Sequence, residues 1–544
     1  MLPSGFDFNT SINQVPILTD YNSFTTNEVL QNAINAYGGG WINEQAKAFG
    51  ELMGSYKMQE AGDMANKNLP VLKTHDRFGN RLDIVNYHPA YHEMMEAAIR
   101  HQVHSITWTS GNKGSYLAHS VLSYLKQQID EGSSCPLTMT FAVVPSLRLE
   151  PDIAREWLPL VLSNEYDERH IPYAHKKGVT FGMAMTEPQG GSDVRANLTF
   201  AKATGKGVYQ ITGRKWFCSA PMSDAFLVLA QTGKGLSCFL VPRFTPDGGK
   251  SQLHFQRLKD KLGNKSNASG EVEFHGAWGR IIGDEGRGIA NIMEMVRHTR
   301  LDCAIGSAGT IQRALTEAIH HCNHRSVFGK KLIDQPLMKN VLADLSLESE
   351  AATTLAMRLA KGFDDSLLNE EATYFTRIAT AIGKFWNTKR AMLVLGEALE
   401  CLGGNGYVEE SIMPRLYRDV PVNSIWEGSG NVQALDVLRA MHKEPRSIEA
   451  LMNYFQKAKG LDSSLDLHLK HLDQLISHPD EFKARIIVEK MALAIQAIEL
   501  IQVAPHTIAQ LFCESRLSEK RNATWGTLEN ENVLDEVINR TYCA

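Results

Sequence analysis

The chain has 544 residues and a mass of 60.5 kDa, too long for one simple hydrophobic core, so two to four packed units are expected. Hydrophobic residues make up 43% and charged residues 22%, the balance of an ordinary globular protein. A formal net charge of only -5 excludes a global positive field that would draw the chain onto nucleic acid or an anionic membrane.

Other classes of protein are excluded by local features. The first twenty residues lack a basic segment followed by an apolar one, so no secretory signal is predicted. The longest apolar stretch, 491–504, contains Glu499 and predicts a buried bundle helix and no membrane span. The eight cysteines include no C-x-x-C pair, which predicts no metal site and no disulfide framework and favours the reducing cytoplasm.

The pattern along the chain changes from helical to extended and back. Residues 1–40 are rich in Asn and Thr and predict an extended surface arm, followed by mostly helical sequence. Short apolar runs separated by turn signals then predict a small antiparallel β domain. Helical periodicity returns from about residue 290, and a helix is expected to end near Lys443, before Pro445. We therefore expect an α+β fold, mainly α, with units at 1–180, 181–290, 291–445 and 446–544.

A glycine-containing segment, FGMAMTEPQGGSDVRA, precedes the predicted strands. Gly190 and Gly191 permit a tight turn with its amides in a concavity, where Thr186 and Ser192 could hydrogen-bond a planar, acceptor-rich ring. Taken alone, GGSD is equally compatible with a structural β-turn. In GRKWFCSA (213–220), Trp216 predicts either apolar cover for a flat ligand or a core residue.

A second glycine-containing segment spans 399–431 and includes the sequence IWEGSGN. Its glycines let backbone approach a ligand closely. Glu427 lies between Trp426 and Gly428, where an aromatic neighbour can desolvate the carboxylate and raise its pKa toward the range of a general base. The alternative is an ordinary solvated loop glutamate.

These segments resemble the two signatures of acyl-CoA dehydrogenases. Residues 184–196 are similar to the first at every constrained position, and 399–431 to the second throughout. Further segments resemble the family at 257–274, 297–309 and 324–345, so the resemblance covers roughly residues 90–440. It implies an N-terminal helical domain, a central antiparallel β domain and a C-terminal four-helix bundle, here with an extra helical C-terminal domain.

The resemblance also implies a cofactor and roles for individual residues. Glu427 would be the catalytic base and Arg300 would lie near the acyl-CoA. Arg325 would face the FAD pyrophosphate, because a planar guanidinium matches phosphate oxygens. The loop of glycines would touch FAD held mainly by a neighbouring subunit. The full set expected to bind FAD is Met183, Met185, Thr186, Gly191, Ser192, Trp216, Ser219, Arg325, Phe328, Gln335, Gly403, Gly404, Ser429 and Asn431.

The ends of the chain resemble the AidB-type alkylation-response flavoproteins. The similarity lies in the N-terminal NQVPILTDYN, in SSCPLTMTFAVVP (133–145), in PVNSIWEGSGN and in the extra C-terminal hundred residues. This branch implies a homotetramer with FAD, weak dehydrogenase activity and double-stranded DNA as a partner of the C-terminal domain. Differences from ordinary dehydrogenases, such as Cys218 for Thr and Arg297 for Asp, concern acyl-CoA recognition more than FAD binding.

The C-terminal segment is not basic as a whole. Residues 447–544 hold ten Lys and Arg against fourteen Asp and Glu, a net charge of -4 (10 - 14). Phosphate-binding modules are normally basic. Either a local basic face exists, around Lys483–Lys490 or Arg516–Arg521, or the helices carry an ordinary mixed-charge surface.

Two functions therefore follow from the sequence. The first is α,β-dehydrogenation of an acyl-CoA thioester by Glu427 and FAD, with the acyl length and the electron acceptor left open. The second is a non-catalytic, flavin-stabilised tetramer that binds DNA or sequesters long-chain acyl-CoA.

Overall fold

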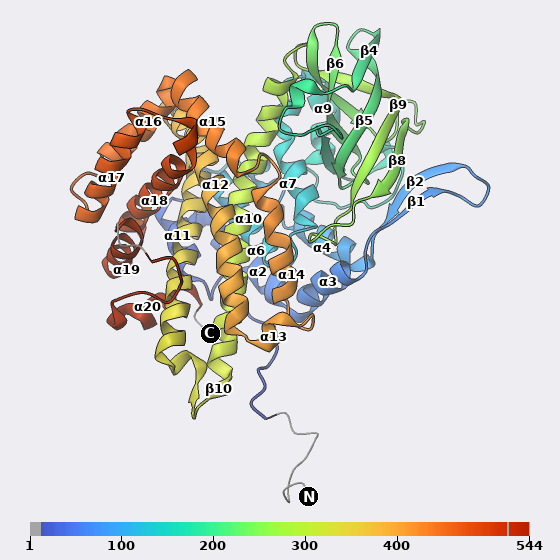
Figure 1. The fold of residues 1–544 in the computed structure, drawn as a ribbon. Helices are drawn as coiled ribbons and strands as arrows, with labels where there is room; N and C mark the ends of the chain where they lie inside the picture. The colour runs from blue at the N-terminus through green and yellow to red at the C-terminus, as the bar shows by residue number, and fades with distance from the viewer. Residues whose placement is uncertain (1–11, 519–521, 543–544) are drawn as a thin grey trace, which may run out of the picture.

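The expected order of helices, β domain and helices is present in the computed structural model of the chain (Figure 1). It describes residues 12–518 and 522–542. Residues 1–11 of the predicted arm, and Lys520 and Arg521 of one predicted basic face, lie outside the described residues. Residues 12–27 have no regular secondary structure and lead into the first helix, which spans Glu28–Ala36 and buries Leu30 and Ile34. The prediction of an extended arm up to residue 40 is therefore wrong from residue 28 onward, because the apolar residues there follow a helical spacing.

The N-terminal region is a helical layer around one buried helix. Every residue of Ser115–Gln127 (α6) is buried, as expected for a helix surrounded by others. The other helices are α1 (Glu28–Ala36), α2 (Asn43–Gly54), α3 (Tyr56–Lys67), α4 (Pro89–Arg100), α5 (Ile106–Thr109), α7 (Ser134–Ala142), α8 (Val144–Leu147) and α9 (Pro151–Val161). The mostly helical prediction missed one hairpin, β1 (Val71–His75) with β2 (Arg81–Asn86), which projects from the layer (Figure 1).

The β domain closes on itself. Its strands are β3 (Phe181–Ala184), β4 (Phe200–Gly205), β5 (Val208–Ser219), β6 (Ala225–Thr232), β7 (Gly235–Pro242), β8 (Leu253–Leu258) and β9 (Ser269–Ile282). The order is β3-β6-β4-β5-β9-β7, and an additional pairing of β6 with β7 closes the ring. Buried side chains such as Ile211, Phe226, Phe239 and Val272 fill its interior.

The predicted fold class is confirmed, with one correction to the strand directions. β3 pairs with β6 in parallel, with Phe181 opposite Ala225, so the sheet is mixed and not purely antiparallel. Turn signals between neighbouring runs predict hairpins only. β3 comes directly from the helical layer and joins a strand that is not its sequence neighbour.

The C-terminal bundle is built from long helices. These are α10 (Gly288–His324), α11 (Pro336–Ser366), α12 (Glu370–Cys401) and α15 (Gly430–Lys443), with the short helices α13 (Gly404–Tyr407) and α14 (Met413–Asp419) between the last two. At a rise of 1.5 Å per residue, the 37 residues of α10 extend about 55 Å. The two ends of α10 therefore belong to opposite ends of the molecule (Figure 1).

The C-terminal segment packs on the outer side of this bundle (Figure 1). Its helices are α16 (Pro445–Gln456), α17 (Ser463–Ile476), α18 (Ala484–Val503), α19 (His506–Phe512) and α20 (Leu534–Thr541). Residues 491–500 of α18 are all buried, which confirms the prediction of a bundle helix. In the part of the chain that the structure describes, no helix has the length and apolar character to cross a membrane.

The expected division into four units stays a proposal. The boundary at 180 falls directly before β3, the one at 290 in the first turn of α10, and the one at 445 at the first residue of α16.

Candidate active site

Glu427, the predicted base, lies in the loop between a 3-10 turn (η5, Val420–Ser424) and α15. Its carboxylate accepts a hydrogen bond of 2.7 Å from the hydroxyl of Thr299 on α10. Burial raises the pKa of the Glu427 carboxyl above its ordinary value, although the Thr299 hydroxyl, Arg300 and Lys384 each lower it. The net shift is upward, as a general base working near neutral pH requires.

The backbone of this loop has an unusual conformation. Glu427 has a φ of 57°, in the left-handed region that side chains other than glycine rarely adopt, and Gly428 follows with a φ of 100°. A Cβ at Gly428 would lie 2.6 Å from Nε2 of Gln433, so the position requires glycine. Of the predicted FAD residues, Ser429 is the N-cap of α15 and Asn431 lies exposed in its first turn.

Three helices each send one donor to the carbonyl groups of the 426–428 loop. From α12, Nζ of Lys384 donates to the two carbonyl oxygens that flank Glu427, at 2.9 and 2.6 Å. From α10, Nε of Arg300 donates to the carbonyl of Glu427 at 3.1 Å. From α15, Nε2 of Gln433 donates to the same oxygen at 2.9 Å and to the next one at 3.1 Å.

Sequence reasoning missed Lys384 and Gln433. Gln433 could have been suspected because it lies six residues after Glu427, within reach of the same loop. Lys384 belongs to the middle of a helix with no motif around it, so only the packing of α12 against the loop identifies it.

Arg300, expected near the acyl-CoA, is buried and braces the loop. Its NH1 lies 2.8 Å from the carboxylate of Asp436 on α15, which Arg377 on α12 also contacts at 2.8 Å. These ion pairs tie the loop to the bundle. Contact between Arg300 and an acyl-CoA stays a prediction.

Two hydrogen bonds in series fix the indole of Trp426. Its Nε1 donates to Oδ1 of Asn423 at 2.9 Å, and Nδ2 of Asn423 donates to the carboxyl of Glu131. Glu131 is buried, and its Oε2 has no hydrogen-bond partner among the described residues. Burial, together with the charge of Asp419, raises the pKa of Glu131 to about 8. This second buried carboxyl was not expected from the sequence.

The first signature forms an exposed turn at the end of β3. Glu187 and Gly190 form a β-bridge, and the carbonyl of Thr186 accepts from the backbone N–H of Trp216 at 2.8 Å. A Cβ on Gly191 would lie 2.8 Å from the hydroxyl of Thr186. Residues 188–193, with Ser192, are exposed. The turn thus presents backbone and hydroxyl groups to solvent from a fixed position.

A buried ion pair anchors this turn to the barrel. Glu187 lies 2.8 Å from Nζ of Lys215 on β5. Burial would raise the pKa of Glu187, but hydrogen bonds from Lys215 and from residues 198–199 lower it to about 2. Met183 and Met185 are half-buried on either side of the end of β3.

Cations surround Trp216 on β5. Nζ of Lys259 lies 3.2 Å from the centroid of its ring system, and the guanidinium carbons of Arg214 and Arg257 lie at 5.3 and 5.8 Å. All three cations contact the single carboxylate of Glu271. Three cations and one carboxylate leave a net positive charge beside the half-buried indole, which suits a ligand that carries negative charge.

The β domain near Ser219 contacts the segment that leads to Glu427. The hydroxyl of Ser219 lies 3.0 Å from that of Ser269, which Nζ of Lys261 contacts at 3.4 Å. Burial raises the pKa of Cys135 on α7 to about 12, with Lys261 lowering it and Glu427 raising it. The backbone N–H of Asn264, in the loop between β8 and β9, donates to the carboxylate of Asp419 of α14 at 2.6 Å, so the β domain contacts the segment that leads to Glu427.

The remaining predicted FAD residues lie elsewhere in the chain. Arg325 follows α10 directly, and Phe328 and Gln335 belong to the hairpin β10 (Ser326–Val327) and β11 (Lys330–Lys331) and the turn after it. Along α10, the segment from Arg300 to His324 spans about 36 Å. The short helix α13, which begins at Gly404, lies at the same end of the molecule as this hairpin (Figure 1). One chain therefore does not bring the residues around Arg325 together with those of the β domain and the Glu427 loop.

We call Arg325, Phe328, Gln335, Gly403 and Gly404 the distal set. The end of the molecule where they lie has the features of a contact surface. Phe328 is 97% exposed with a φ of 52°, and Leu337 and Tyr407 are 84% and 81% exposed. The N-terminal arm reaches this end, because the carbonyl of Asn13 accepts from NH1 of Arg325 at 2.5 Å. Large apolar side chains exposed to this degree indicate a surface that meets another molecule.

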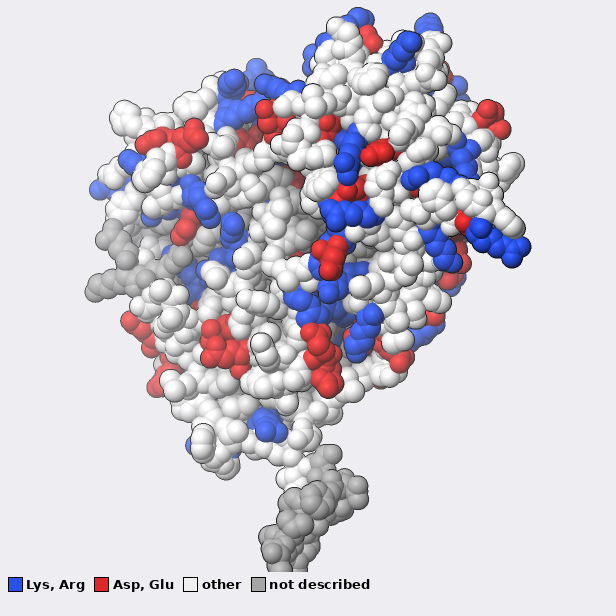
Figure 2. All heavy atoms as spheres, turned by 45° about the vertical axis from the view of Figure 1, so that its right-hand side comes forward, with Lys and Arg blue, Asp and Glu red and all other residues white. Residues whose placement is uncertain are grey.

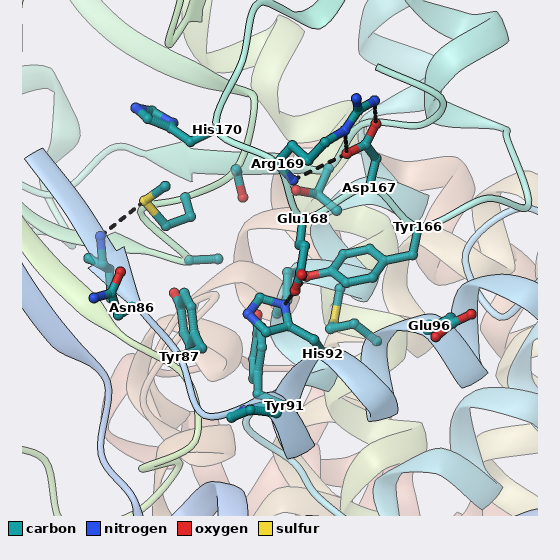
Figure 3. A pocket seen from close by; sticks show the side chains of 18 of the residues that line it. Asn86, Tyr87, Tyr91, His92, Glu96, Tyr166, Asp167, Glu168, Arg169 and His170 are labelled. Atoms are coloured by element: carbon teal, nitrogen blue, oxygen red, sulfur yellow. Dashed lines mark hydrogen bonds and ion pairs between the residues drawn. The ribbon is translucent and has the colours of Figure 1, made fainter. Parts of the chain in front are cut away.

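A separate cavity of about 900 Å³ lies on the N-terminal side of the β domain (Figure 3). Tyr87, Tyr91 and His92 line it from one side, and His92 points toward Tyr166 and Glu168, at 2.8 and 2.9 Å. None of the predicted site residues lines this cavity, but Pro136 and Ala220, which directly follow Cys135 and Ser219, do.

Three family models match successive parts of the chain. They are the adaptive response protein AidB N-terminal domain at 13–168, the acyl-CoA dehydrogenase middle domain at 182–277 and the acyl-CoA dehydrogenase C-terminal domain at 286–442. The chain is also 42% identical over 514 residues to the putative acyl-CoA dehydrogenase AidB of Escherichia coli K12, covering 94% of this chain and 95% of that one. The chain belongs to the acyl-CoA dehydrogenase family.

Solved structures agree with this assignment. ACDH-11 of Caenorhabditis elegans, in complex with C11-CoA, superposes with a TM-score of 0.84 at 25% identity, over 99% of this chain and 93% of that one. The apo-form of Bd2924 gives a TM-score of 0.83 at 28% identity, over 90% and 100%. Within the acyl-CoA dehydrogenase family the chain is similar to AidB along nearly its whole length, as the sequence predicted.

Membership makes the chain an FAD-dependent, acyl-CoA dehydrogenase-like flavoprotein. Its own residues fit the cofactor. Gly190 and Gly404 have open space where a Cβ would stand, and Gly403 has a φ of 58° and a ψ of -139°, a conformation open in practice to glycine alone. Both loops therefore let a ligand approach backbone closely, and the half-buried indole of Trp216 offers a flat apolar surface beside the first loop.

Proposed function

We propose that the chain oxidises an acyl-CoA thioester between Cα and Cβ, with Glu427 as the base. The main support is the position of Glu427, on a loop that is hydrogen-bonded to three helices. Its carboxylate has a raised pKa and accepts a hydrogen bond from the hydroxyl of Thr299. A carboxyl held in one orientation loses little entropy when it meets the Cα proton.

The proposed roles of the residues follow from these contacts. Glu427 accepts the proton from Cα, and Thr299 keeps the carboxylate in one rotamer. The chemistry that FAD supplies when bound is acceptance of the hydride from Cβ. Thr186, Trp216 and Ser219 are proposed to hold the flavin ring. The burial of Glu427, which raises its pKa, also keeps bulk water from competing for the proton.

We also propose that the FAD site is shared between subunits of a homotetramer. The distal set, with Arg325 and Phe328, lies about 36 Å along α10 from the residues that contact Glu427. A second copy supplying this set would complete the site. The exposure of Phe328, Leu337 and Tyr407 supports a protein contact at this end.

DNA binding by the C-terminal segment stays a weaker alternative. Arg516 contacts the carboxylates of Asp344 and Glu348, and Arg540 contacts those of Glu28 and Glu350. Both guanidinium groups are therefore already neutralised by carboxylates of the same chain. On the face seen in Figure 2, basic and acidic side chains are interspersed over the surface, whereas phosphate binding favours a continuous basic stripe.

The deciding experiment is anaerobic mixing of the flavin-loaded protein with saturated acyl-CoAs of increasing chain length. Loss of the visible flavin absorbance with at least one thioester supports dehydrogenation. C11-CoA is a sensible member of the panel because the C. elegans relative was solved with it. If no thioester bleaches the flavin, catalysis is excluded and a binding role is favoured.

A further inference from the structure

The ammonium group of Lys384 is fully buried and, among the described residues, contacts backbone carbonyl groups and no carboxylate. Its side chain is 0% exposed, and no Asp or Glu oxygen of the described residues lies within the ion-pair distance of 4.0 Å. Burial lowers the pKa of Lys384. A buried charge with no carboxylate in direct contact is costly, so its place in α12 calls for a specific explanation.

The hydrogen bonds of this ammonium group provide that explanation. It donates to the carbonyl oxygens of Trp426 and Gly428, at 2.9 and 2.6 Å, one on each side of the base. Glu427 between them has the strained φ of 57°. A left-handed conformation at a glutamate persists only when its surroundings impose it, and a single group bonded to both neighbouring carbonyls imposes it directly.

The other donors to the loop cannot replace Lys384. Nε of Arg300 reaches only the carbonyl of Glu427, and Gln433 reaches that carbonyl and the one of Gly428. Only Lys384, among the described residues, bonds the carbonyl of Trp426 from a helix of the bundle. The loop is therefore bridged across the base by this one ammonium.

We propose that Lys384 is a positioning residue for catalysis: it sets the conformation of the loop that presents Glu427 and, as a buried cation, favours the ionised form of that carboxylate. This inference rests on the proposed role of Glu427 as the base. The charged and titratable groups that act on Glu427 or on Lys384 from the surrounding elements are Arg300 and Cys303 on α10, Cys135 on α7, and Lys389 on α12.

The test is Lys384→Met in the full-length, flavin-loaded protein, compared with Lys361→Met, a half-buried lysine of α11 that contacts Asp365. Methionine matches the length of lysine, and replacing a buried unpaired charge by an apolar side chain usually preserves folding. A crystal structure reports the φ of Glu427, and the pH dependence of flavin reduction by an acyl-CoA reports the pKa of the base.

We expect Lys384→Met to keep FAD and KM while kcat falls by about ten- to a hundredfold, because the base is displaced. The acid limb of the pH profile should move to higher pH, since a cation that favours the carboxylate is gone. Lys384→Gln, neutral but able to donate to one carbonyl, should show the same pH shift with a smaller loss of kcat. Lys361→Met should match the parent in both measurements.

An unchanged φ at Glu427 together with an unchanged pH profile in Lys384→Met would overturn the proposal. If Lys384→Met is not recovered folded, the pH profile of Lys384→Gln decides in its place. The φ of Glu427 can be measured in a crystal structure without substrate, so this readout does not depend on dehydrogenase activity. If the parent is never reduced by any thioester, dehydrogenation fails, while a relaxed Glu427 in the variant still establishes what Lys384 does to the loop.

Discussion

Thr299 and Glu427 are separated by 128 residues in sequence, yet the threonine hydroxyl donates to the glutamate carboxylate over 2.7 Å. The contact joins the N-terminal part of α10 to the loop before α15. It fixes the rotamer of the proposed base and lowers its pKa, against the upward effect of burial. The predictions below start from this arrangement.

Glu427→Gln should keep FAD and assembly while flavin reduction by acyl-CoA is abolished. The amide keeps the volume of the side chain and can still bond Thr299, but it cannot accept the Cα proton. A general base contributes about a hundred- to ten-thousandfold in rate, so rapid-mixing absorbance at the flavin band measures the loss easily. Reduction kinetics equal to those of the parent would move the base to another residue.

Trp216→Ala and Thr186→Ala should weaken FAD retention. Removing the indole deletes apolar contact area, and removing the hydroxyl deletes a hydrogen bond worth about 1 kcal/mol, or roughly a fivefold change in Kd. Absorbance of the flavin after dialysis gives the occupancy. Trp278→Ala, a half-buried indole on β9 opposite Gln210, is the matched control and should retain FAD. Full occupancy in both variants would show that FAD binds elsewhere.

Arg325→Ala should lose FAD and loosen the assembly together. If two subunits share the cofactor, a residue of the distal set affects both properties by mass action. Light scattering and flavin absorbance on the same sample test this, with the exposed Arg439→Ala on α15 as the control. A monomeric parent with one FAD per chain would contradict the shared site.

Glu131→Gln should stabilise the protein increasingly as the pH rises from about 5 to 8. Burial raises the folded-state pKa of Glu131 from 4.5 to about 8. The folded state therefore holds a proton that the unfolded state releases, and the parent loses stability across this interval, by at most about 1.4 kcal/mol per pH unit. Denaturant midpoints at pH 5 and pH 8 measure the difference. A variant-to-parent difference independent of pH would show that Glu131 is ionised in the folded protein.

Duplex DNA should bind weakly, with Kd above about 10⁻⁶ M at physiological salt and a strong salt dependence. Truncation at Pro445 would expose the bundle surface covered by α18, so the double variant Lys483→Glu with Lys490→Glu is the better probe. It should lower affinity only slightly, as judged by fluorescence anisotropy across a salt series. Tight binding at physiological salt that this variant abolishes would reveal a basic face on α18.

Much of the fold was predictable because its signals are local. Residues 491–504 were expected to form a buried helix, and they lie in α18 and its C-terminal cap, with 491–500 fully buried. The end of a helix near Lys443 was also confirmed, since α15 ends there. The β1–β2 hairpin and the parallel pairing of β3 with β6 were missed, because both depend on partners that alternation and turn residues do not specify.

The sequence by itself determined the family, the cofactor and the proposed base. These follow from contiguous motifs, whose residue types and spacing resemble the acyl-CoA dehydrogenase signatures and can be recognised without knowing what packs around them. Only the tertiary structure decided which groups hold Glu427. Thr299, Lys384 and Gln433 come from three helices, and helical periodicity tells which face of a helix is buried but not which loop that face meets. The same reason separates Arg325 from the loop of the base. The motifs assign Arg325 to FAD and Glu427 to the acyl-CoA, whereas the length of α10 decides that one chain cannot bring these two residues to the same site.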